Sequence, residues 1–319
     1  MPVPPLIASI PTSYGDARRE YAALREGCGL DRVAARCLVH VEPENADAAI
    51  ATLDVRPGPA AAVQLAVVRN ADGLLAGCVS VIHRPTGPLL LDGSNPRVDR
   101  IIGERLGVAR DGLGDTVVRI RLRGPSTGTV LASVGAPAPV ASGAIEESAV
   151  IDGLPVIVCT TGADRCALYC DRHHARRIWD TIVTAGAVSV GSIALETVRI
   201  EDAEPCLERD FPGPVAVADA GFADLSHRPS DRVLVAVEHE GSIAFDRGTV
   251  LAGDGTAVGE VRVAAISVRR AGRPIAFALI DEAHASAGTI LSLDGGVVRA
   301  RAIVTAAVAL PPDAASPNY

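Results

Sequence analysis

The sequence predicts an α+β protein in which two α+β units are followed by a small antiparallel β-barrel. Helical and strand-like segments alternate over residues 1–230, and their order repeats loosely from about residue 144. From Asp231 the pattern changes to short apolar runs separated by turn residues, with almost no helical period, which is typical of a small antiparallel barrel or sandwich. We therefore expect one unit over 1–143, a second over 144–230, a β-barrel over 231–312 and a disordered tail over 313–319.

The first unit opens with a predicted helix from Asp16 to Leu30, in which Tyr21, Leu24 and Cys28 recur at helical spacing. Further along, the sequence NADG at Asn70 to Gly73 joins two strand-like runs and predicts a hairpin turn. The other elements predicted here are strands at CLVHV, PLLLD and TVVRIRLRGP and helices at NADAAIATL, IIGERLG and STGTVLASVG.

The same sequence patterns predict the elements of the second unit and of the barrel. The strands LPVIVCTTG and CALYCD precede the helices HHARRIWDTIVTAG and SIALETVRIEDA. The barrel strands are predicted within VLVAVEHEG, TVLAGDGTAVGEVRVAAI, RPIAFALID and GTILSLDGGVVRARAIVTAAV.

Composition excludes several classes of function. A formal net charge of -8 argues against binding to a nucleic-acid backbone. All 30 basic residues are arginine, which excludes Schiff-base lysines, pyridoxal-phosphate attachment and a Walker A loop. We see neither a membrane-spanning apolar run nor a signal peptide, so we expect a cytoplasmic protein that interacts with neither membrane nor nucleic acid.

The seven cysteines are an odd number and have no C-x-x-C spacing, which argues against disulfides. Cys159, Cys166, Cys170, His173 and His174 are residue types that bind zinc. However, Cys166 and Cys170 lie in a strand-like run, which favours buried or edge thiols. We therefore expect no metal site.

Several separated stretches resemble the glycine-cleavage T-protein (aminomethyltransferase) family. DGSNPRVD is similar to its N-A-S-N-R-E-K-D segment, RLRGPSTGTVLASVG to its Q-G-P-x-A-x-x-L element, and ALETVRIEDA to its A-R-D-x-L-R-L-E-A-G signature. The run from GTVLAGDG to TILSL is similar to the C-terminal barrel of the family, and the likeness extends from about Tyr14 to Pro311. The resemblance implies two α+β units that bind folate, a β-barrel, and tetrahydrofolate as the cofactor of a one-carbon transferase.

The resemblance also gives roles to individual residues. Asp99 falls on the last Asp of the family segment, which implies a catalytic carboxylate beside the folate nitrogens; the alternative is an acid that complements a helix N-terminus. Glu201 falls on the glutamate that is implied to hold the pterin ring, and one carboxylate can accept from both donors on the pterin edge; the alternative is an exposed glutamate after a helix. Asn95, Arg199 and Tyr169 are weaker cofactor-binding candidates, with structural roles as the alternative.

The departures from the family bear on the reaction. Its T-G-E-x-G-x-E motif reads TGADRCA here, so that Ala163 and Ala167 replace both glutamates, and its G-W-x-M-P-V and F-I-G-K-like stretches are missing. We therefore expect transfer to or from a small molecule, without glycine cleavage itself and without a lipoyl carrier protein as partner. The alternatives are a folate-binding or iron–sulfur maintenance protein without catalysis, and a scaffold repurposed for another reaction.

Overall fold

The computed structural model describes residues 11–34, 37–55, 62–85, 88–93, 96–106, 116–138, 142–211, 215–220, 222, 230–245 and 247–308. The chain forms two compact units. Unit 1 consists mainly of Met1–Val68 and Ala76–Leu195, and unit 2 mainly of Glu196–Pro311. The tip of one hairpin, Arg69–Leu75, groups with unit 2, where the Leu75 N–H donates to Val215 O at 3.0 Å.

Unit 1 contains a six-stranded sheet, and its strands come from both predicted α+β units. In spatial order they are β11 (Val188–Ser189), β1 (Gly29–Ala34), β7 (Val117–Arg123), β10 (Arg165–Asp171), β9 (Leu154–Gly162) and β8 (Ile145–Ile151). The β11–β1 pair is parallel and the other pairs are antiparallel. The predicted division at residues 143/144 stays a prediction, but β1 and β7 precede it in this sheet whereas β8, β9 and β10 follow it.

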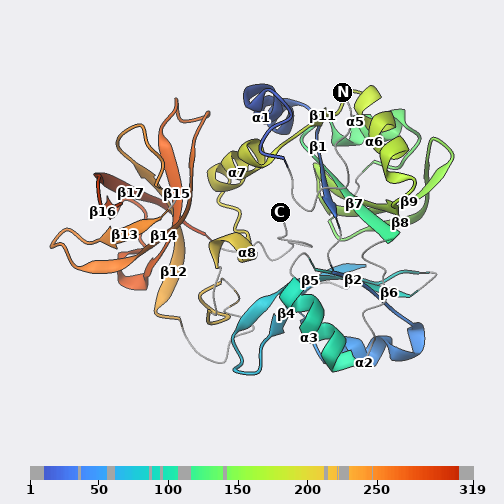
Figure 1. The fold of residues 1–319 in the computed structure, drawn as a ribbon, viewed down its shortest axis with the longest axis horizontal. Coiled ribbons are helices and arrows are strands. Elements are labelled where there is room, and N and C mark those ends of the chain that lie inside the picture. The colour runs from blue at the N-terminus through green and yellow to red at the C-terminus, as the bar shows by residue number, and fades with distance from the viewer. Residues whose placement is uncertain are drawn as a thin grey trace. The chain divides into compact units, whose positions relative to one another are not determined.

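A five-stranded sheet, which lies mostly in unit 1, follows the order β2 (Cys37–Val41), β6 (Leu89–Gly93), β5 (Leu75–Ile82), β4 (Val63–Arg69) and β3 (Asp54–Val55). All residues of β5 and β6 are buried, because both faces of these strands are covered. One face packs against α2 (Ala46–Ala51) and α3 (Pro96–Leu106), shown in Figure 1, through residues such as Ala49, Val98 and Ile102.

The second face of this sheet meets the six-stranded sheet. Val63, Ile82 and Leu90 form one apolar cluster with residues of β9 and β10, including Ala167 and Tyr169. The far face of the six-stranded sheet packs against α5 (Thr127–Ser133) and α6 (Ala175–Thr184). Unit 1 is therefore layered as helices, sheet, sheet and helices (Figure 1).

The alternation in β7 explains how the six-stranded sheet presents two different faces. Val118, Ile120 and Leu122 are buried in the core under α5 and α6. The arginines between them point to the opposite face, because successive side chains of a strand alternate. These arginines are Arg119, Arg121 and Arg123.

Unit 2 is dominated by a closed barrel. Its strands follow the order β12 (Arg232–His239), β15 (Pro274–Asp281), β14 (Ala257–Ile266), β13 (Gly248–Leu251), β16 (Ile290–Asp294) and β17 (Arg299–Ala307). The strands of this barrel approach closely at Gly259, where an added Cβ would lie 2.3 Å from Leu279 O. The barrel confirms the sequence prediction for this region.

The described residues contain three further α-helices and two 3-10 turns. They are α1 (Ala17–Glu26), α7 (Ser192–Glu201), α8 (Leu207–Asp210) and the 3-10 turns η1 (Pro43–Asn45) and η3 (Glu282–His284). No helix in the described ranges is long and apolar enough to cross a membrane. The predicted tail at 313–319 lies outside the described residues.

Most predicted elements are confirmed, and one needs correction. The first helix was expected to run to Leu30, but α1 ends at Glu26 and β1 begins at Gly29. The Gly27 carbonyl accepts from the Ser126 N–H at 2.9 Å instead of extending the helix. A Cβ on Gly124 would lie 2.5 Å from the same carbonyl oxygen, so this corner needs glycine for close backbone contact.

Candidate functional site

The segment that carries the predicted catalytic residue begins at the end of β6. α3 starts at Pro96, a residue suited to the first helical position because it lacks an N–H that would need a partner. Val98 and Ile102 are fully buried and hold α3 on the five-stranded sheet. Asp99 is in the first turn of α3, where a carboxylate complements the helix dipole. Its side chain and the whole of Asn95 lie outside the described part of the chain.

Asp92, within β6, links the two sheets of unit 1. Its Oδ2 accepts from Arg119 Nη1 at 2.6 Å and from the Tyr169 hydroxyl at 2.5 Å. These three residues are at most 4% exposed. Asp92 belongs to the five-stranded sheet, whereas Arg119 and Tyr169 belong to β7 and β10 of the six-stranded sheet. The strand that leads to Asp99 is therefore anchored across the sheets by polar bonds as well as by apolar packing.

The surroundings of Tyr169 and Arg119 favour the protonated form of both side chains. Burial and the neighbouring Asp92 carboxylate both raise the pKa of Tyr169 well above its usual value, so the phenol stays protonated and donates its hydrogen bond. Burial alone would lower the pKa of Arg119, but Asp92 and Tyr169 outweigh it and the pKa is raised. Among the described residues, Asp92 Oδ1 and the Nε and Nη2 of Arg119 have no hydrogen-bond partner. The cluster thus depends on the two bonds at Oδ2.

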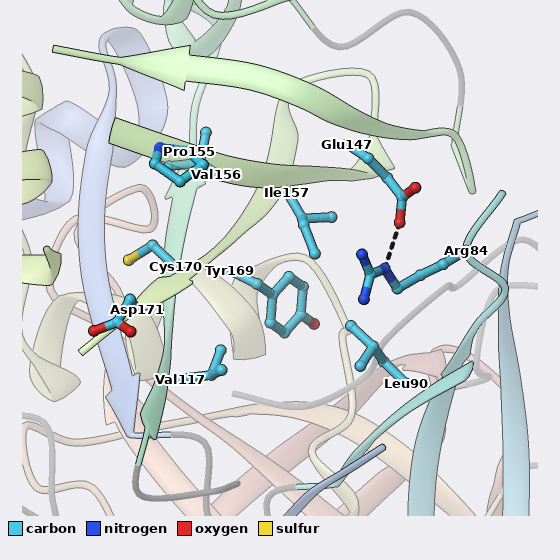
Figure 2. A pocket seen from close by; sticks show the side chains of 10 residues that line it. All are labelled: Arg84, Leu90, Val117, Glu147, Pro155, Val156, Ile157, Tyr169, Cys170 and Asp171. Carbon is cyan, nitrogen blue, oxygen red and sulfur yellow. Dashed lines mark hydrogen bonds and ion pairs between the residues drawn. The ribbon is translucent and has the colours of Figure 1, made fainter. Parts of the chain in front are cut away.

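Tyr169 also lines a pocket of about 290 Å³ in unit 1, shown in Figure 2. Leu90, Val117 and Ile157 make apolar parts of its wall. An ion pair between Arg84 and Glu147 lies at one side of the pocket, and Asp171 lies at the other (Figure 2). The remaining lining residues are Pro155, Val156 and Cys170.

Glu201, the predicted pterin ligand, is the last residue of α7 and is half-buried. Its Oε1 accepts from the Ser267 hydroxyl at 2.5 Å and from the Arg269 backbone N–H at 3.1 Å. Ser267 and Arg269 lie in the turn between β14 and β15. The carboxylate is therefore held by the barrel, within unit 2.

Arg199 lies on the same helix and is fully buried. It donates to both oxygens of Asp210, at 2.8 and 3.0 Å, and also pairs with Glu196. Its guanidinium lies 5.1 Å from the centre of the Phe277 ring. Burial raises the pKa of Asp210 although Arg199 opposes the shift. These contacts join α7 to α8 and β15, so Arg199 has a structural position that supports the helix ending at Glu201.

The predicted site residues thus fall into two groups. Asp99 and Tyr169 belong to unit 1, and Arg199 and Glu201 belong to unit 2, whereas Asn95 lies outside the described residues. Within unit 1, Tyr169 reaches the strand before Asp99 through Asp92.

The sequence alone did not identify Asp92 and Arg119 as an ion pair. The available signal was the alternation of arginine with apolar residues in VVRIRLR, together with a charged residue directly after the apolar run LLL. A strand with one charged face inside a packed protein requires counter-charges.

The cysteines are buried wherever their placement is described. Burial raises the pKa of the Cys159 and Cys166 thiols, which disfavours the reactive thiolate. Within the described ranges, His, Cys, Asp and Glu form no group of three or more that could hold a metal ion. The absence of a metal site stays a prediction for the chain as a whole.

Comparisons with known proteins agree on one family. No family model matches the chain. It is 29% identical over 184 residues to an aminomethyltransferase of Cutibacterium acnes, a match that spans 50% of this chain and 48% of that protein. It is 27% identical over an alignment of 345 residues to an aminomethyltransferase of Streptomyces avermitilis, covering 88% of this chain and 85% of the relative.

The fold has a counterpart among solved structures. The glycine cleavage system aminomethyltransferase T from Bartonella henselae superposes with a TM-score of 0.75 at 16% identity, covering 93% of this chain and 90% of that one. At this identity the likeness concerns the fold alone, and the sequence similarity to the two named aminomethyltransferases is a separate observation. Taken together, the relatives named aminomethyltransferase and the fold of the T protein support the resemblance of this chain to the glycine-cleavage T-protein-like family, at low sequence identity.

Proposed function

We propose that this protein is a tetrahydrofolate-dependent one-carbon transferase that acts on a small molecule and not on the lipoyl-bound aminomethyl group of glycine cleavage. The observation that carries the proposal is that the T-protein fold is kept over 93% of the chain, with carboxylates at both motif positions, Asp99 and Glu201. The curated relatives are named aminomethyltransferases, which supports the same class of chemistry.

The chemistry of Glu201 fits reduced folate. The pterin edge presents an N–H and an amino group as donors, and a carboxylate has two oxygens that can each accept two hydrogen bonds. Glu201 is half-buried, and its Oε1 already accepts from two groups of the barrel turn, so the carboxylate is positioned before a ligand arrives and the pterin donors would have to reach Oε2. When bound, tetrahydrofolate would supply the nitrogen atoms that carry the one-carbon unit.

Asp99 would supply a fixed anion at the start of α3. A carboxylate there would stabilise positive charge that develops on a nearby amine nitrogen and would accept or return a proton. The rigid setting favours this role, since α3 is fastened by fully buried Val98 and Ile102, and the preceding strand by Asp92. Preorganised charge is effective because it does not have to reorient during the reaction.

The lost glutamates support a changed substrate. Ala167 is 4% exposed and lies in the apolar cluster with Tyr169 and Leu90, so the position that carries a carboxylate in the family is here part of an apolar contact between the sheets. Ala163 lies in the tight turn between β9 and β10. We infer that this protein retains the folate side of the reaction and differs on the side of the one-carbon partner.

Transfer can be tested without knowing that partner. The protein is incubated with 13C-labelled 5,10-methylene-tetrahydrofolate and a set of small primary and secondary amines, and the label is followed by NMR. We expect label on at least one amine above the rate without protein, and about a hundredfold slower transfer with Asp99→Asn, the scale of one acid–base group. Transfer at the wild-type rate by this variant would contradict the role of Asp99. Tight folate binding without transfer to any amine would favour the non-catalytic folate-binding alternative.

A further inference from the structure

The turn between β14 and β15 holds the carboxylate of Glu201 in one orientation. Ser267 is fully buried and donates its hydroxyl to Glu201 Oε1 at 2.5 Å, and the Arg269 N–H donates to the same oxygen at 3.1 Å. Two donors at one oxygen restrict rotation of the carboxylate about its last bond. The direction in which Oε2 points is thereby set by the barrel.

Ser267 is itself firmly placed. Its N–H donates to Arg273 O at 2.9 Å, and its carbonyl accepts from the Gly272 N–H at 2.8 Å. Its hydroxyl oxygen accepts from the Arg270 N–H at 3.0 Å while it donates to Glu201. Every hydrogen-bonding group of Ser267 is therefore used, and the serine is a rigid support with a fixed hydroxyl direction.

The helix that carries Glu201 is fixed from the other side. Arg199, two residues earlier on α7, is clamped by Asp210 and stacks on Phe277 of β15. The backbone of Glu201 is thus attached to the barrel through Arg199, and its side chain through Ser267. Orientation of a carboxylate matters most where it must meet two donors of a planar ligand at once, because misalignment of one bond weakens both.

We propose that Ser267, assisted by the Arg269 N–H, is a positioning residue that orients Glu201 for the pterin of reduced folate, so that the barrel takes part in cofactor binding through Glu201. This inference rests on the proposed function. It predicts that the hydroxyl of a residue with no proposed contact to folate controls folate affinity, and that it does so only while Glu201 is present.

The test is a double-mutant cycle on the full chain, with the dissociation constant of tetrahydrofolate measured by calorimetry. Ser267→Ala should weaken binding about tenfold, as expected when one charge-assisted hydrogen bond is lost. In a Glu201→Ala background the same change should weaken binding less than about twofold, because no carboxylate is left to orient. Thr305→Val is the matched control, since it removes a barrel hydroxyl that donates to Ala236 O at 3.0 Å and should leave affinity unchanged.

The possible results distinguish a positioning role of Ser267 from a general structural role in the barrel. Equal loss of affinity from Ser267→Ala in both backgrounds would show that the serine acts on the barrel in general and would overturn the inference. Unchanged affinity in Ser267→Ala, with binding by the wild type, would overturn it while leaving the proposed function intact. If Ser267→Ala does not fold, Ser267→Thr keeps a hydroxyl, and the inference then requires Ser267→Thr to bind within about threefold of the wild type. A wild-type protein that does not bind tetrahydrofolate would overturn the proposed function, and this inference with it.

Discussion

Asp92 and Arg119 form an ion pair between the two sheets of unit 1, with 2.6 Å between Oδ2 and Nη1 and with both side chains at most 2% exposed. A buried pair of this kind contributes little net stability compared with an apolar pair of the same shape, but breaking it leaves one charge buried without compensation. Loss of either charge alone should therefore destabilise unit 1.

We expect Asp92→Asn to lower the free energy of unfolding by about 3–5 kcal/mol, because the amide keeps the shape but leaves the Arg119 charge uncompensated. The double variant Asp92→Leu, Arg119→Met removes both charges and should cost less than Asp92→Asn. Urea denaturation of each protein measures the difference. Asp152→Asn, which breaks an exposed ion pair with Arg177, is the control and should change stability little. Equal stability of Asp92→Asn and the wild type would show that the pair is not the link between the sheets.

Glu20 should anchor the segment before α1. It is 2% exposed, and it accepts from Ser13 Oγ at 2.7 Å, from Tyr14 N at 2.6 Å and from Gly191 N at 2.8 Å. Glu20→Gln weakens these charge-assisted bonds and turns an NH2 group toward donors, so we expect a loss of about 2 kcal/mol.

The loss at Glu20 should be accompanied by faster proteolytic cleavage within residues 11–15, which limited proteolysis with mass spectrometry can locate. The control is Glu26→Gln, an exposed position at the end of the same helix. Equal cleavage rates in the two variants would argue against an anchoring role for Glu20.

His239 should make the stability of the barrel depend on pH. It is 2% exposed, its Nδ1 lies 3.0 Å from Glu240 O, and burial lowers its pKa below the usual value. The folded chain keeps this histidine neutral while the unfolded chain takes up a proton near pH 6.5, so its stabilising contribution is complete above that pH and is lost as pH falls.

We expect His239→Gln to reduce the slope of unfolding free energy against pH between pH 7 and 5, by up to about 1.4 kcal/mol per pH unit. Thermal or urea unfolding at several pH values gives the slope. His173→Gln, at an exposed position on unit 1, should leave it unchanged. An identical slope in His239→Gln and the wild type would mean that His239 does not couple protonation to folding.

Local patterns in the sequence predicted much of the fold. Asp16 caps α1 by accepting from the Arg18 and Arg19 N–H groups, and Asn70 closes the hairpin turn by accepting from Asp72 and Leu74 N–H groups. Both are contacts over a few residues, so the chain nearby is sufficient to predict them.

Long-range pairing was less accessible from the sequence. Arg119 and Asp92 are 27 positions apart in the chain, and Glu201 and Ser267 are 66 positions apart. The alternation of β7 indicates a polar face at Arg119 but not which strand faces it, because that depends on how the sheets pack. The family resemblance identified Asp99 and Glu201 as candidates, whereas the serine that holds Glu201 has no motif of its own.

The proposed function requires this chain to bind reduced folate through Glu201, and a calorimetric titration measures that binding. Tetrahydrofolate is titrated by calorimetry into the wild type, into Glu201→Gln and into Glu240→Gln, which removes an exposed barrel carboxylate of unit 2 as the control. Gln at position 201 keeps a carbonyl oxygen for Ser267 and Arg269 but loses the charge, so we predict similar melting temperatures and a dissociation constant raised tenfold to about a hundredfold. The wild type and Glu240→Gln should bind alike. No binding of tetrahydrofolate by the wild type at millimolar concentration, or equal affinity in Glu201→Gln, would contradict the claim.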